Sequence, residues 1–166
     1  NIIGIFISQD IFTEYVVNNE DTVDVFSYQV PSSYSENQNH PLIVAFHQWG
    51  GNQNTPYNTT FDEEAESRNW FFLSPYGGSS NNYNHQEAQN YTKQAIIWLS
   101  ENYSIDESRI YMVGGSMGGA SGAIYANNHL NPEEPMVAAT ASASGILDCE
   151  RRYYEMDGNN SMTEWF

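Results

Sequence analysis

The sequence predicts an α/β protein in which helices cover both faces of a doubly wound, mostly parallel sheet. Residues 42–46 are continuously apolar, as in a parallel strand that is buried on both faces. Strand-like and helix-like segments then alternate along the chain, which is the order that a doubly wound sheet requires. Residues 12–17 and 22–30 instead alternate apolar with polar side chains, so we expect them to form antiparallel strands at the N-terminal edge.

The remaining elements follow from periodicity and from helix-capping signals. Further strands are expected at residues 70–73, 109–113 and 136–141, and helices at 60–68, 84–103 and 116–129. Thr60 with Glu63 forms a capping box, and Asn84 with Glu87 has the same spacing, so each pair predicts a helix start. Ser161 with Glu164 forms another capping box close to the last residue of the sequence.

Length and charge exclude two classes of partner. The 166 residues are enough for a single domain with a buried core. Five Lys plus Arg against 21 Asp plus Glu give a net charge of -16, which repels a phosphate backbone, so we expect no nucleic-acid partner. No stretch approaches the roughly 18 apolar residues that cross a bilayer, so we expect no membrane partner. The acidic, lysine-poor composition favours an extracellular, secreted protein.

The most informative motif is Gly-x-Ser-x-Gly at residues 114–118. It follows an apolar strand-like run and precedes a stretch of small residues that is typical of a helix. A serine at the tip of a sharp strand-to-helix turn needs glycine two positions away on either side, because a Cβ atom there would collide with the turn. This arrangement predicts the nucleophile elbow of an α/β-hydrolase, with Ser116 as the nucleophile.

A serine nucleophile also needs backbone amides that stabilise the developing oxyanion. In this fold one donor is the residue after the nucleophile, which is Met117 here. The second comes from the loop after an early central strand. That loop is predicted at residues 47–51.

Four segments resemble a group of secreted esterases that includes feruloyl esterases, acetyl-xylan esterases and extracellular polyhydroxybutyrate depolymerases, together with related predicted peptidases. They are residues 28–34, 41–51, 71–77 and, above all, 103–119. The resemblance implies an α/β-hydrolase that acts on carboxylic esters. Relatives usually carry glycine where this chain has Gln48. By position, Trp49 then supplies the second oxyanion amide, with Gln48 as the alternative.

The base and the acid of a catalytic triad should follow the serine. His129 is the only later histidine, and it lies thirteen residues along the predicted helix, roughly 20 Å from Ser116. We therefore expect His129 at the surface and the catalytic histidine outside this sequence. Asp148 follows the strand predicted at 136–141 and is a candidate acid, although a solvated loop aspartate is the alternative.

Several residues near the predicted mouth of the site are candidates for substrate binding. Gln48 and Tyr76 follow two neighbouring strands, and Trp49, Tyr57 and Tyr83 could stack on a sugar or an aryl group. The acidic clusters lack calcium-loop spacing and no His/Cys cluster suggests zinc, so we expect neither a metal nor another cofactor.

These features predict a secreted serine esterase that acts on polysaccharide-linked feruloyl or acetyl esters or on a polyester. Residues 1–166 would form the N-terminal portion of one α/β-hydrolase domain. A further segment of about 80 or more residues, or a companion chain, would supply the histidine. Two alternatives stay open: a non-catalytic, degenerate hydrolase domain used for binding or assembly, and a serine peptidase of the prolyl-oligopeptidase type.

Overall fold

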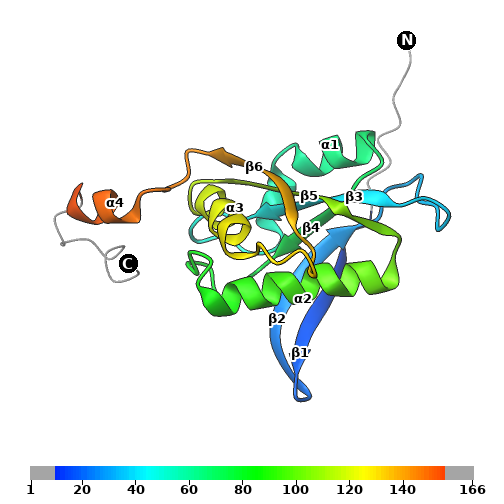
Figure 1. Cartoon of the computed structure of the whole chain (residues 1–166), viewed down its shortest axis with the longest axis horizontal. Helices are drawn as coiled ribbons and strands as arrows, with labels where there is room; N and C mark the ends of the chain where they lie inside the picture. Colours follow the sequence, from blue (N-terminus) through cyan, green and yellow to red (C-terminus); the bar gives the residue numbers. More distant parts are fainter. Residues whose placement is uncertain (1–9, 156–166) are drawn as a thin grey trace, which may run out of the picture.

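Six strands pair into one mixed sheet within residues 10–155, the part of the chain that this computed structural model describes. The strands are β1 (Phe12–Asn18), β2 (Asp21–Gln29), β3 (His40–Phe46), β4 (Phe71–Pro75), β5 (Ile105–Gly115) and β6 (Val137–Ala143). Their order across the sheet is β1-β2-β4-β3-β5-β6 (Figure 1). β2 runs antiparallel to both β1 and β4, whereas β4, β3, β5 and β6 are parallel. The predicted sheet, parallel with antiparallel N-terminal strands, is confirmed.

Helices pack on both faces of this sheet. The elements are η1 (Thr55–Asn58), α1 (Phe61–Ser67), α2 (Gln86–Asn102), α3 (Met117–Asn128) and α4 (Cys149–Glu155). α2 and α3 contribute Leu99 and Tyr125 to the larger hydrophobic core, and α1 contributes Ala65 to the smaller core on the opposite face. The chain order β3-α1-β4-α2-β5-α3-β6 therefore gives the doubly wound arrangement that the sequence predicts. Figure 1 shows α4 apart from the sheet and from the other helices.

Strand β3 explains why one segment of the sequence is continuously apolar. Every residue of β3 is buried, because both of its faces are covered. Leu42 and Val44 point into the larger core, while Ile43 and Ala45 point into the smaller one. β3 ends at Phe46, so the next residues begin at the carboxyl edge of the parallel strands, where ligands bind in open α/β sheets.

Strand β6 is the last strand at one side of the described sheet. It pairs in parallel with β5, and residues 138–143 are all exposed. The helix α3 nevertheless lies close to it, since a Cβ atom added to Gly122 would lie 3.2 Å from Cγ2 of Thr140. The small residues in β6 and α3 therefore allow the strand and the helix to approach one another closely.

Two helix starts differ from the predicted ones. Thr60 precedes α1 without a side-chain cap, and the hydroxyl of Thr59 accepts the Phe61 amide instead, at 3.2 Å. The helix α2 is capped by His85, whose side chain accepts from the Ala88 amide, and not by Asn84. Asn84 has a positive φ of 54°, and its side chain donates to the Ser121 carbonyl of α3 and not to the start of α2. The two expected helices are present, but the capping box at Thr60 and the helix start at Asn84 are wrong. The capping box at residues 161–164 lies outside the described residues.

No helix in residues 10–155 combines the length and the apolar character that a membrane span needs.

Candidate active site

Ser116 occupies the sharp turn between the end of β5 and the start of α3. Its φ is 54° and its ψ is -123°, a backbone conformation that costs a non-glycine residue about 1–3 kcal/mol. The surrounding elements impose this conformation, because the Ser116 amide donates to the Ala143 carbonyl of β6 at 2.9 Å. The Ser116 carbonyl accepts from Ala120 in α3 at 3.2 Å. The Ser116 side chain is exposed, so the turn presents a serine hydroxyl to solvent at the carboxyl edge of the sheet.

The two outer glycines of the motif are required by close packing. A Cβ atom added to Gly114 would lie 2.9 Å from the Cα of Gly118, and one added to Gly118 would lie 2.9 Å from the His47 carbonyl oxygen. Real Cβ atoms essentially never show such contacts. At Gly115, by contrast, the nearest atom would be the Ala143 carbonyl oxygen at 3.8 Å, an ordinary contact. Gly114 thus has the steric cause that the sequence predicts, a collision within the turn, whereas Gly118 is required by the end of β3 and the residue after it.

The loop after β3 has a defined peptide orientation at Gln48 and Trp49. The Gln48 carbonyl oxygen accepts from the Gly51 amide at 2.9 Å and lies 2.9 Å from Nδ1 of His47. Because the described peptide bonds are trans, the N–H of Trp49 points away from that carbonyl and from the His47 ring. Gly50 has a φ of 77°, and its amide donates to the Ser80 carbonyl at 2.8 Å. The loop is therefore held in one conformation by its own turn and by the neighbouring loop after β4.

Met117 brings the second candidate amide beside this loop. As the first residue of α3, it has a backbone N–H without an acceptor inside the helix. Its side chain is buried and lines a cavity of about 10 Å³ together with Phe46 and His47. The first turn of α3 therefore lies against the end of β3 and the loop that follows it.

The predicted substrate-binding residues lie around the same loop. Gln48 is exposed, and the half-exposed ring of Trp49 packs against Tyr83 with ring centroids 5.6 Å apart. The ring of Tyr76 lies 5.9 Å from the imidazole of His47, and its carbonyl oxygen lies 2.9 Å from Nε2 of His47. Tyr57 is different, since it packs on Phe72 with its hydroxyl buried. That Tyr57 lies near the mouth of the site stays a prediction.

Comparison with known proteins decides the fold. No protein-family model matches the sequence, and no curated protein matches it. Solved structures do match. The fluorophosphonate-binding serine hydrolase FphF of Staphylococcus aureus superposes with a TM-score of 0.70 at 11% identity, over 87% of this chain and 60% of that one. The fold is that of an α/β-hydrolase.

Two further solved α/β-hydrolase structures are named as esterases. The acetyl xylan esterase of Aspergillus awamori matches with a TM-score of 0.59 at 19% identity, over 81% of this chain and 53% of that one. The ferulic acid esterase AmCE1/Fae1A of Anaeromyces mucronatus matches with a TM-score of 0.61 at 15% identity, over 81% of this chain and 57% of that one. This chain thus spans between half and two thirds of the length of these structures.

All four histidines lie within the described part of this α/β-hydrolase fold, and each has contacts elsewhere. His40 Nδ1 lies 3.1 Å from the Asn69 carbonyl oxygen, and His47 lies between the Gln48 and Tyr76 carbonyls. His85 caps α2. The ring of His129 stacks on Tyr125 with centroids 3.9 Å apart. In residues 10–155 no imidazole is hydrogen-bonded to the Ser116 hydroxyl.

His129 differs from expectation in one respect. Its side chain is half-buried and not fully at the surface, because the ring lies flat against Tyr125 with an interplanar angle of 9°. Burial is the main cause that lowers its pKa, and the nearby Lys93 acts in the same direction. The structure gives His129 a packing role at the end of α3, far from the Ser116 end of that helix.

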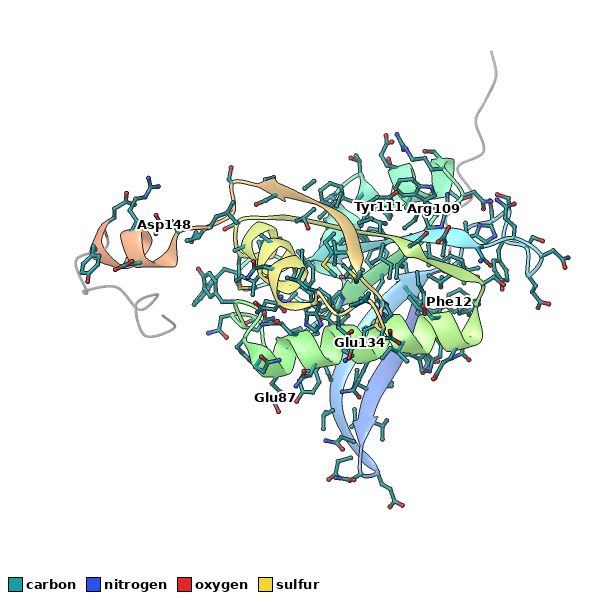
Figure 2. All side chains as sticks on the ribbon, in the orientation of Figure 1. Phe12, Glu87, Arg109, Tyr111, Glu134 and Asp148 are labelled. Carbon is teal, nitrogen blue, oxygen red and sulfur yellow. The ribbon has the colours of Figure 1, made fainter. Side chains whose placement is uncertain are left out.

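Asp148, the candidate acid, lies at the start of α4. Its carboxylate is exposed and accepts a hydrogen bond of 2.8 Å from the Arg151 amide, so it caps the helix. Figure 2 shows the labelled residue well away from the sheet. The described structure does not bring Asp148 to any imidazole, and its place in a triad stays a prediction.

Three buried polar residues near the site were missed by the sequence reasoning: Asp24, Asn82 and Asn84. The Asp24 carboxylate accepts from the Gly77 and Gly78 amides, each at 2.9 Å. Burial raises the pKa of Asp24, while the hydrogen bonds from backbone amides act in the opposite direction. The alternation of β2 gives one signal for Asp24, since it shares a face with the buried Phe26. No motif signals the two asparagines.

Within residues 10–155 no group of three or more His, Cys, Asp or Glu side chains could hold a metal ion. That the reaction needs neither metal nor other cofactor stays a prediction.

Proposed function

We propose that this protein is a serine hydrolase that cleaves carboxylic esters through an acyl-enzyme on Ser116. The observation that carries the proposal is the strained, exposed Ser116 at the end of β5, where an unfavourable backbone conformation is imposed by α3 and β6. Such strain persists only where the surrounding structure over-determines it, and it is concentrated at functional sites. The fold likeness to structures named as esterases supports the choice of ester chemistry.

The residues of this chain would perform the first half of the reaction. The Ser116 Oγ attacks the ester carbonyl carbon, its proton passes to a general base, and the carbonyl oxygen becomes an oxyanion. The amides of Met117 and Trp49 would donate to that oxyanion. When the tetrahedral intermediate collapses, the C–O bond to the alcohol breaks and the base returns the proton to the leaving oxygen. Water then releases the acid from Ser116 by the same steps.

The general base is assigned to polypeptide outside residues 1–166. All four histidines of the sequence have other contacts, and Ser116 remains exposed. Either a continuation of the chain or a companion polypeptide would supply the histidine. The same segment would also supply the acid, unless Asp148 takes a different position in the complete protein and serves as the acid itself. The exposed strand β6 lies beside Ser116 and offers such a segment an edge to pair with.

The substrate class proposed is a feruloyl or acetyl ester on a polysaccharide, or a polyester, met outside the cell. The aromatic pair of Trp49 and Tyr83 lies on the loops that flank the proposed oxyanion site, and Tyr76 is close by. Aromatic faces suit both sugar rings and a feruloyl group. Two of the similar structures are named for these substrates, which supports the same assignment here.

Turnover by the native full-length polypeptide tests the proposal. We expect hydrolysis of p-nitrophenyl acetate and methyl ferulate, and we expect Ser116→Ala to lower kcat by on the order of 10⁴-fold or more. Ser67→Ala, on the exposed end of α1, is the matched control and should keep wild-type rates. Faster turnover of peptides than of esters would assign a peptidase of the prolyl-oligopeptidase type. A native protein that neither hydrolyses esters nor has a companion polypeptide with a histidine for the site would favour the degenerate, non-catalytic alternative.

A further inference from the structure

The loop that connects β4 to α2, residues 76–85, holds the proposed oxyanion loop in place. It contacts residues 47–51 through three links of different kinds. Gly50 donates to the Ser80 carbonyl at 2.8 Å, Nε2 of His47 lies 2.9 Å from the Tyr76 carbonyl oxygen, and the Trp49 ring packs on Tyr83. Any change in the shape of residues 76–85 would therefore move the Gln48–Trp49 peptide.

The shape of residues 76–85 is itself improbable for a free chain. Tyr83 and Asn84 both have positive φ, 43° and 54°, although neither is glycine. Such residues occupy the left-handed region only at a cost, unless local hydrogen bonds compensate. Gly77 and Gly78 also have positive φ, 75° and 79°, and residues 76–85 contain neither a helix nor a strand. Something other than secondary structure must hold this loop.

The side chain of Asn82 holds this loop from within. It is 7% exposed. Its Nδ2 donates to the carbonyls of Tyr76 and Ser79, each at 2.9 Å, and its Oδ1 accepts from the Asn84 amide at 2.8 Å. One amide group thus uses three hydrogen bonds to fix both ends of the loop. Tyr76 is also the residue whose carbonyl faces His47.

The side chain of Asn84 fastens the same loop to the nucleophile helix. Its Nδ2 donates to the Ser121 carbonyl of α3 at 2.7 Å, and the backbone carbonyl of Asn84 accepts from Nε2 of Gln89 at 2.7 Å. The hydroxyl of Ser121 in turn donates to the Met117 carbonyl at 2.9 Å. The loop 76–85 therefore contacts both segments that carry the proposed oxyanion amides.

We propose that Asn82 and Asn84 are positioning residues that set the separation of the Met117 and Trp49 amides. Neither side chain would touch the substrate. They act through the shape of residues 76–85, which contacts the loop 47–51 on one side and α3 on the other. The two amides come from segments far apart in the chain, which meet directly where Gly118 lies against the carbonyls of Phe46 and His47. Residues 76–85 add a second link between the same two segments. The inference rests on the proposed function of Ser116.

Three asparagines in this loop allow a matched test. Asn82→Asp and Asn84→Asp keep the side-chain size and one acceptor oxygen but lose the donors to the Tyr76, Ser79 and Ser121 carbonyls. Asn81→Asp makes the same charge change at a residue that is only partly buried and has no role in these bonds. Asn84→Gly is a second variant that tolerates the positive φ without burying a charge.

The measurement is kcat of the native full-length protein per active site, with sites counted by end-point titration with a fluorophosphonate. We expect Asn82→Asp, Asn84→Asp and Asn84→Gly to lower kcat per site by about 10-fold to 100-fold, less than the 10²–10³ that follows outright loss of a donor. KM for p-nitrophenyl acetate should stay within about threefold, and the affinity for an aryl boronic acid, which mimics the tetrahedral intermediate, should fall in parallel with kcat/KM. Asn81→Asp should match the wild type.

Unchanged kcat per active site in Asn82→Asp and Asn84→Gly would overturn the inference. A fall in the number of titratable sites alone would not rescue it, because that result reports a loss of folded protein. Unchanged boronic acid affinity beside a lower kcat would overturn it as well. A wild-type protein without ester turnover would instead remove the proposed function, and the inference with it.

Discussion

Gly118 in the first turn of α3 faces the carbonyl oxygen of Phe46, the last residue of β3, so closely that an added Cβ atom would collide with it. The nucleophile turn and the loop proposed to hold the oxyanion therefore meet at backbone atoms, which side-chain rotation cannot move apart. We expect Gly118→Ala to force α3 away from β3 and to lower the free energy of unfolding by about 1–3 kcal/mol, the usual cost of overpacking.

Gly115→Ala is the control for this first prediction. The same methyl group there would lie 3.8 Å from its nearest neighbour, so stability should stay within about 0.5 kcal/mol of the wild type. Urea unfolding of both variants measures the difference. Equal stability of the two would contradict the packing described for Gly118.

The second prediction concerns the pH dependence that Asp24 contributes. Burial raises the pKa of the Asp24 carboxyl above its ordinary value of 3.8, so between that value and the raised one the folded protein binds more protons than the unfolded chain. The contribution of Asp24 to stability is therefore fully present below about pH 4 and is lost as the pH rises through the raised pKa. We expect the free energy of unfolding of the wild type, relative to Asp24→Asn, to fall as the pH rises.

Urea unfolding of both proteins from pH 4 to pH 7 tests this sign. Groups other than Asp24 cancel in the difference between the two proteins. If the free energy of unfolding of the wild type, relative to Asp24→Asn, instead rises with pH, the hydrogen bonds from the Gly77 and Gly78 amides affect the pKa of Asp24 more than burial does.

The third prediction separates the side chain of Trp49 from its backbone amide. Trp49→Ala leaves the N–H in place but removes the ring that packs on Tyr83. We expect KM for methyl ferulate to rise about 2-fold to 10-fold, the equivalent of one aromatic contact of roughly 0.5–1.5 kcal/mol. The increase in KM for p-nitrophenyl acetate should be smaller than that for methyl ferulate. Trp49→Phe, which keeps an aromatic ring, should restore most of the affinity for methyl ferulate. Equal losses for both esters would contradict a role of the ring in substrate selection.

The parts of the site that the sequence predicts are those encoded by local patterns. The apolar run in β3 reflects burial on both faces, and Gly114 is required by a collision within the turn, with the backbone of Gly118. These features are determined by residues close together in the chain. The loop after β3 was likewise placed correctly, because it follows directly from the end of a recognisable strand.

The remaining parts depend on contacts between residues that are distant in sequence. Asp24 bonds Gly77 across 53 residues, and Asn84 bonds Ser121 across 37. Asn84 has the spacing of a helix cap, but its side chain donates to the Ser121 carbonyl of α3 instead. A pattern read along the chain cannot distinguish these two uses of the same residue type.

The central claim is that Ser116 is the nucleophile, and site-specific labelling tests it most directly. The native full-length protein is treated with a fluorophosphonate, and the modified peptide is identified by mass spectrometry. We predict a single phosphonylated serine at Ser116, no label in Ser116→Ala, and unchanged labelling in the surface control Ser67→Ala. Labelling at another serine, or an unlabelled wild-type protein that retains ester hydrolysis, would contradict the account.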